Sequence, residues 1–132
     1  MKKNIFVILA LLLFPLLTGC SSKYLKDISI EELNTKLKNN ETFVLYFNDE
    51  NNNIEDTLVK VLEEKNIIGY KINTSKITND EKLELQTKID YEKPSIVFVV
   101  DGKDPSIMSH ITDKDVKKER IEANLKDMGF IK

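Results

Sequence analysis

The sequence is poor in the residue types on which many reactive and metal-binding sites depend. Among 132 residues it has one cysteine, one histidine, four glycines and no tryptophan. One cysteine cannot form an intrachain disulfide or a dithiol pair, and one histidine without a thiol cluster does not make a set of zinc ligands. The glycines are scattered, so no glycine-rich phosphate-binding loop can be recognised. We therefore expect no metal, no cofactor and no enzymatic activity.

The charge and composition fit a folded domain that does not bind nucleic acid. The formal net charge is −2 at pH 7, and 41% of the residues are hydrophobic. An acidic excess argues against a nucleic-acid-binding surface, and this hydrophobic content is typical of a globular domain. Asp49, Asn51 and Asn53 alternate as in the first half of a calcium-binding loop. Ile54 and Lys60 stand where such a loop needs glycine and a bidentate glutamate, so the segment does not fit an EF-hand.

The N-terminal segment has the features of a signal peptide that ends in a lipidated cysteine. Two lysines precede an apolar run of about 13 residues, which is too short to cross a ~30 Å hydrocarbon core. The run ends in Leu17-Thr18-Gly19-Cys20, which resembles the lipobox of bacterial lipoproteins. That resemblance implies that residues 1–19 are cleaved and that a diacylglyceryl group is joined to the Cys20 sulfur. Two acyl chains anchor stably, so we expect an extracytoplasmic protein held on the cell membrane, with residues 20–27 as its tether.

The first half of the mature chain alternates helical and strand patterns. Ser29 and Glu32 have the spacing of a capping box, and a helix is predicted from there to the Asn39-Asn40 pair. The segment Thr42–Phe47 is rich in β-branched and aromatic residues, which is typical of a buried strand. A polar turn follows at residues 48–53. Apolar residues then recur with helical spacing from position 54 to about position 65, which predicts an amphipathic helix.

The second half repeats this alternation. A strand is predicted over residues 67–73. Thr78 and Glu81 again have capping-box spacing, for a helix that ends near Lys88. Residues 95–100 form the most apolar stretch of the mature chain, which predicts a central strand.

The C-terminal part predicts a hairpin and a last helix. Asp101-Gly102 is a hairpin-turn signal, with residues 107–111 as the returning strand and His110 facing outward. Thr112 and Asp115 are predicted to cap the last helix. Gly129 suits the end of that helix.

This order of elements resembles thioredoxin over nearly the whole mature chain, about residues 28–132. Three segments carry the resemblance: the strand 42–47 that leads through a turn into a long helix, the segment 91–103 and the closing helix around 120–125. In segment 91–103 Pro94 precedes the apolar strand, where thioredoxins have a cis-proline. No segment before Ser29 predicts the first strand of that family, and many small relatives lack it. The resemblance implies an α/β fold with a central mixed sheet flanked by helices.

The chain departs from the family at its reactive centre. Thioredoxins carry Cys-x-x-Cys where the long helix begins, and those two positions fall near Asn52 and Glu55, or one residue later. An amide is not a nucleophile and a carboxylate cannot form a mixed disulfide, whereas the family's chemistry needs an activated thiolate. Lipidation of Cys20 would block its sulfur as a thioether. The sequence therefore predicts a redox-inactive domain.

Binding is the function that such a domain would retain. In the family, the backbone beside the cis-proline pairs with an extended segment of the partner, a form of strand addition. That position is occupied here by Lys93, Pro94 and Ser95, and the polar turn would form the facing lip through Asn48, Asp49, Asn52 and Asn53. We therefore expect an accessory or adaptor that binds a peptide or an envelope protein.

Two alternatives remain open at this point. Both segments could be ordinary solvated loops with no binding role. The protein could also be related to thiol-disulfide oxidoreductases and act through the cysteines of a partner.

Overall fold

The computed structural model describes residues 23–50, 52–89, 92–103 and 110–132. The predicted signal peptide and Cys20 lie outside the described residues. The elements are β1 (Leu25–Asp27), α2 (Ile30–Lys38), β2 (Phe43–Phe47), α3 (Ile54–Lys65), β3 (Gly69–Ile72), the 3-10 helix η1 (Thr74–Lys76), α4 (Asn79–Gln86), β4 (Ser95–Val99) and α5 (Lys118–Asp127).

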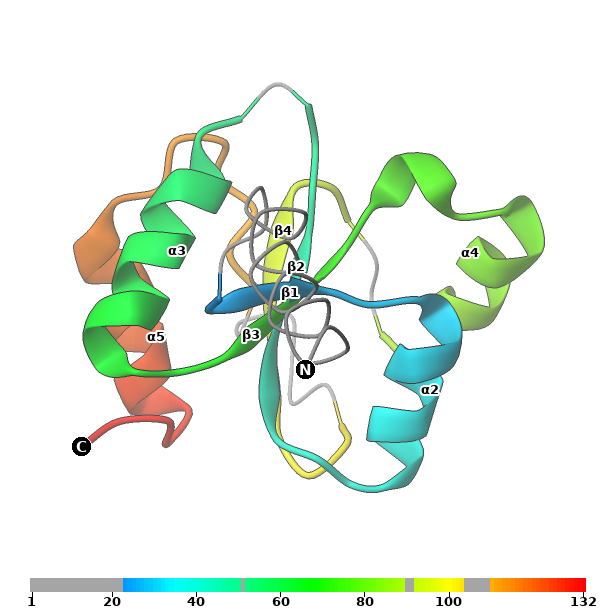
Figure 1. Cartoon of the computed structure of the whole chain (residues 1–132), viewed down its shortest axis with the longest axis horizontal. Coiled ribbons are helices and arrows are strands. Elements are labelled where there is room, and N and C mark those ends of the chain that lie inside the picture. Colours follow the sequence, from blue (N-terminus) through cyan, green and yellow to red (C-terminus); the bar gives the residue numbers. More distant parts are fainter. Residues whose placement is uncertain (1–22, 51, 90–91, 104–109) are drawn as a thin grey trace, which may run out of the picture.

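The strands form one mixed sheet with helices on both faces. Its order is β1-β3-β2-β4, with β1, β3 and β2 parallel to one another and β4 antiparallel to β2. Helices α3 and α5 cover one face, whereas α2 and α4 cover the other (Figure 1). Because both faces are covered, every residue of β2 and β4 is buried. The predicted α/β architecture is confirmed.

Each face of the sheet has its own hydrophobic core. Successive residues of a strand point to opposite faces, so Val44 and Tyr46 pack with α3 and α5. Phe43, Leu45 and Phe47 pack on the other face with residues of α2 and α4. The continuous apolar run that predicted a buried strand is therefore divided between two cores.

Two helices begin where their capping boxes predict. The backbone N–H of Glu32 donates to Ser29 Oγ over 3.1 Å, and the Glu32 carboxylate accepts from the Ser29 N–H over 3.0 Å. Thr78 and Glu81 make the same pair of bonds at the start of α4, at 3.2 and 2.9 Å. Each box satisfies two N–H groups that a helix leaves without a partner.

Strand β1 was missed by the sequence analysis. It pairs in parallel with β3, with Leu25 opposite Gly69, and the Leu25 side chain is 4% exposed in the core. It lies in the segment that was predicted to be tether, so the ordered sheet begins three residues before the expected start of the domain at Ile28. A three-residue strand with two charged residues has too little pattern to be recognised without its partner.

The start of the last helix was also predicted wrongly. Helix α5 begins at Lys118 after an N-cap at Lys117, whereas Thr112 and Asp115 lie in the preceding loop. Tertiary contacts hold this loop in place: Ile111 exchanges backbone hydrogen bonds with Ile96. Long-range pairing therefore overrides the local capping signal.

The two ends of the predicted hairpin and the end of α5 are described. Asp101 and Gly102 have φ angles of 52° and 71°, as a tight hairpin turn requires. Residues 107–109 of the expected returning strand lie outside the described residues. His110 is 8% exposed, so the prediction that it faces outward is wrong.

Helix α5 ends at a glycine, as expected. Gly129 has a φ of 83°, and the N–H of Phe130 donates to the Leu125 carbonyl.

Candidate functional site

The predicted binding residues come together at one end of the sheet. Phe47 at the end of β2 pairs with Ser95 at the start of β4. The loop after β2 and the segment before β4 are therefore neighbours at this end. The Lys93–Pro94 peptide bond is cis, as predicted. We call this region the loop corner and define it by Asn48, Asp49, Asn52, Asn53, Lys93, Pro94 and Ser95.

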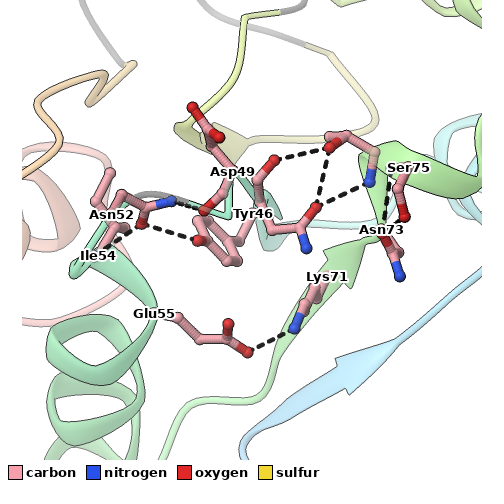
Figure 2. Close-up of polar contacts among 10 residues, drawn as sticks. Tyr46, Asp49, Asn52, Ile54, Glu55, Lys71, Asn73 and Ser75 are labelled. Atoms are coloured by element: carbon pink, nitrogen blue, oxygen red, sulfur yellow. Dashed lines mark hydrogen bonds and ion pairs between the residues drawn. The ribbon is translucent and has the colours of Figure 1, made fainter.

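Asn52 orders the loop after β2 through three hydrogen bonds (Figure 2). Its Oδ1 accepts from the Tyr46 hydroxyl over 3.1 Å and from the Ile54 N–H over 2.9 Å. Its Nδ2 donates to the backbone carbonyl of Asp49. The bond to Ile54 satisfies an N–H group at the start of α3, where the side chain of the N-cap residue Asn53 makes no capping bond. Asn52 therefore has a structural role, although it stands near a predicted redox position.

Tyr46 is the buried partner of Asn52. Its ring belongs to the core on the α3 and α5 face and is 1% exposed. Burial raises the pKa of the Tyr46 phenol to about 12. The hydroxyl is therefore a neutral donor at physiological pH.

Asn48 connects the loop after β2 to the end of the neighbouring strand β3. Its Oδ1 accepts from the backbone N–H of Thr74 over 2.9 Å, and its backbone carbonyl accepts from Thr74 Oγ1 over 2.9 Å. Thr74 opens η1, directly after β3. These bonds connect the ends of two neighbouring parallel strands, so the Asn48 side chain is also used within the fold.

The rest of the loop is more exposed. The Asn53 side chain is exposed, while its N–H donates to the carbonyl of Lys114 over 3.2 Å. Asp49 is half-buried. Near this loop, Lys71 of β3 and Glu55 of α3 form an ion pair, with 2.7 Å between Lys71 Nζ and Glu55 Oε1 (Figure 2).

The segment before β4 differs in the exposure of its three residues. Pro94 and Ser95 are buried, and Ser95 Oγ donates to the Glu92 carbonyl over 2.8 Å. Lys93 is exposed. The N–H and the carbonyl of Ile96 are hydrogen-bonded to Ile111, on the side of β4 that faces away from β2. Pro94 directly precedes β4, and proline has no backbone N–H to donate.

The loop corner offers contacts for binding. Within residues 23–50, 52–89, 92–103 and 110–132, no group of three or more His, Cys, Asp or Glu side chains could hold a metal ion. In the same part of the chain, no helix is long and apolar enough to span a bilayer. The loop corner presents the exposed Lys93 and Asn53 and a polar loop that is bonded within the fold.

Sequence reasoning did not identify Tyr46 and Thr74 as parts of this site. Tyr46 lies in the predicted buried strand, and its hydroxyl gives no pattern that points to Asn52. The one local signal is the position of Asn52 two residues before the first apolar residue of a helix, because Asn side chains commonly bond the backbone two residues on.

Comparison with known proteins places the fold. No family model and no curated protein sequence matches this chain. A protein assigned as an oxidoreductase with a thioredoxin fold matches with a TM-score of 0.62 and 17% identity, over 76% of this chain and 93% of that chain. Thioredoxin O2 from Arabidopsis thaliana matches with a TM-score of 0.58 and 14% identity, over 81% and 96% of the two chains. At such identities the likeness shows the fold alone, and the predicted thioredoxin fold is confirmed.

Proposed function

We propose that this protein is a membrane-anchored, redox-inactive lipoprotein with a thioredoxin fold that binds a peptide or an envelope protein at its loop corner. Cys20 carries the diacylglyceryl anchor, and the mature chain lies on the extracytoplasmic face of the cell membrane. Its role is that of an accessory or adaptor. It has no catalytic residue of its own.

The observation that carries the proposal is that the side chains at the start of α3, where the family has its reactive thiols, are bonded within the fold. Asn52 caps this helix and binds Tyr46, whereas thiol exchange needs a thiolate in this region. Glu55, the second predicted redox position, is paired with Lys71. The residues that stand at these positions support the fold of the loop, so the scaffold is retained without the chemistry.

Recognition would use the backbone before β4. An extended segment of the partner adds beside the Pro94 carbonyl, as in other cases of strand addition. Lys93 is the exposed cation of this segment. The partner therefore presents an extended stretch with an acidic or polar residue near Lys93.

Photocrosslinking in native membranes tests this proposal. A benzophenone amino acid is placed at Lys93 in the full chain, and in a matched control at Lys38, an exposed lysine in the last turn of α2. We expect a discrete crosslinked species from position 93 and none from position 38. We expect Lys93→Glu to weaken capture of that species roughly fivefold, which corresponds to about 1 kcal/mol, and Lys38→Glu to leave it unchanged.

Two results would contradict the proposal. Equal crosslinking from both positions would mean that the loop corner is not the binding surface. Disulfide reduction by the purified protein above background would mean that it is not redox-inactive, and would favour the oxidoreductase-related alternative.

A further inference from the structure

The end of the sheet opposite the loop corner lies close to the proposed lipid anchor. Strand β1 begins at Leu25, so only Ser21 to Tyr24 separate it from Cys20. An extended chain spans at most ~3.5 Å per residue, so Cys20 lies within roughly 18 Å of Leu25. A domain of about 100 residues has a radius of gyration of ~13 Å, which for a compact sphere means a diameter of roughly 34 Å. This tether is therefore shorter than the domain is wide and restricts which side can approach the bilayer.

The side chains at this end suit a membrane interface. Ile68, which precedes β3, is 42% exposed, and it is one of two exposed large hydrophobic residues in the described part of the chain. The N–H of Gly69 donates to the Tyr24 carbonyl over 2.7 Å, so the chain around Ile68 runs beside Tyr24. Lys23 Nζ lies 5.6 Å from the centroid of the Tyr24 ring. An aromatic ring, a lysine and an exposed aliphatic residue are the usual occupants of the headgroup region.

A second cation lies on the connection that leads to Ile68. Lys65 is exposed and ends α3, and Asn66 then turns the chain in the left-handed conformation toward β3. The acids on this turn of the helix are Glu63 and Glu64, of which Glu64 lies 2.5 Å from Lys118 Nζ. We call Lys23, Tyr24, Lys65 and Ile68 the tether corner.

The other exposed large hydrophobic residue serves as an internal reference. Leu83 on α4 is 64% exposed, and α4 covers the opposite face of the sheet from α3 (Figure 1). Ile68 lies beside Tyr24, which is four residues from Cys20 in the sequence, whereas Leu83 lies on α4. Exposure alone therefore does not distinguish the two side chains, but their position relative to Cys20 does.

We propose that the tether corner rests on the anionic bilayer surface, with Ile68 at the level of the lipid headgroups. This inference depends on the lipid anchor of the proposed function. Strands β1, β3 and β2 are parallel, so their starts lie at the tether corner and the loop corner lies at their other end. The bound protein thus presents its loop corner away from the membrane.

The test uses full-length lipidated protein in vesicles of phosphatidylethanolamine and phosphatidylglycerol. Ile68→Cys, and Leu83→Cys as its matched control, provide the labelling thiol because the anchored Cys20 sulfur is blocked. Each variant is labelled with an environment-sensitive fluorophore and exposed to lipids that carry a nitroxide in the headgroup. We expect strong quenching at position 68 and little at position 83. Lys65→Gln should lower the ratio of docked to undocked protein about fivefold, the effect of one lysine near an anionic surface.

The outcomes separate this inference from the anchor itself. Protein that floats with the vesicles but shows equal quenching at both positions would overturn the docked orientation and leave the anchor standing. Protein that does not float would overturn the anchor, and with it the inference. Quenching at position 68 that is unchanged by Lys65→Gln and by replacement of phosphatidylglycerol with phosphatidylcholine would overturn the role of the anionic surface.

Discussion

The loop corner and the tether corner lie at opposite ends of the same sheet and are built in different ways. At the loop corner, the side chains of Asn48, Asn52 and Ser95 are hydrogen-bonded within the fold. At the tether corner, Ile68 is exposed. The first end uses its polar side chains within the fold, and under the proposed function it offers backbone to a partner. The second end leaves an aliphatic side chain exposed, which under the further proposal meets lipid.

This difference shows what a scaffold can keep when its reactive groups are absent. A loop that begins a buried helix must still satisfy the N–H groups of that helix. Asn52 does so while it also accepts from the buried Tyr46 hydroxyl. The amide therefore maintains the shape of the loop, and that shape is what a binding function needs.

The largest expected effect comes from Asn52→Ala. The substitution leaves the buried Tyr46 hydroxyl without its acceptor and removes the side-chain cap of α3. We expect the free energy of unfolding to fall by about 1–3 kcal/mol, measured by urea denaturation at neutral pH.

Asn53→Ala is the matched control for this variant. Asn53 is the adjacent residue, but its exposed side chain makes no capping bond. We expect a change within about 0.5 kcal/mol. Equal losses for the two variants would mean that the loop corner is no more rigid than an ordinary surface turn.

A second effect, of at most similar size, is expected at high pH. The pKa of Tyr46 is raised to about 12 in the folded protein, against ~10 in an unfolded chain. Because the folded state holds this proton more tightly, the contribution to stability is complete below pH 10. It is lost as the pH rises from about 10 to about 12.

Comparison of the wild type with Tyr46→Phe isolates this contribution from the lysines that titrate in the same range. We expect the free energy of unfolding of the wild type to fall more steeply above pH 10 than that of the variant. Parallel pH profiles would show that Tyr46 titrates normally and is less enclosed than the structure indicates.

The sequence predicted those parts of the fold that depend on local signals. Ser29 with Glu32 and Thr78 with Glu81 located the starts of two helices, because a capping box is complete within four residues. The apolar spacing from Ile54 predicted α3 with both of its ends. The loop after β2 and the segment before β4 are neighbours because they adjoin two paired strands whose patterns were clear, whereas binding at the loop corner stays a prediction.

What the sequence could not predict depends on distant contacts. Strand β1 exists because Leu25 pairs with Gly69, and its three residues carry no periodicity. The last helix starts at Lys118 because the pairing of Ile111 with Ile96 fixes the preceding loop. The internal role of Asn52 depends on a hydroxyl that reaches it from β2. In the first two cases the partner is distant in the sequence. In the third, a side-chain hydrogen bond leaves no pattern in the sequence.

The most direct test of the account is intact mass spectrometry of the protein purified from its native membranes after thiol alkylation. The account predicts a chain that begins at Cys20, carries a diacylglyceryl group and takes up no alkylating reagent, since its one sulfur is a thioether. A chain that retains residues 1–19, or one in which Cys20 is alkylated, would contradict both the membrane anchor and the absence of a thiol.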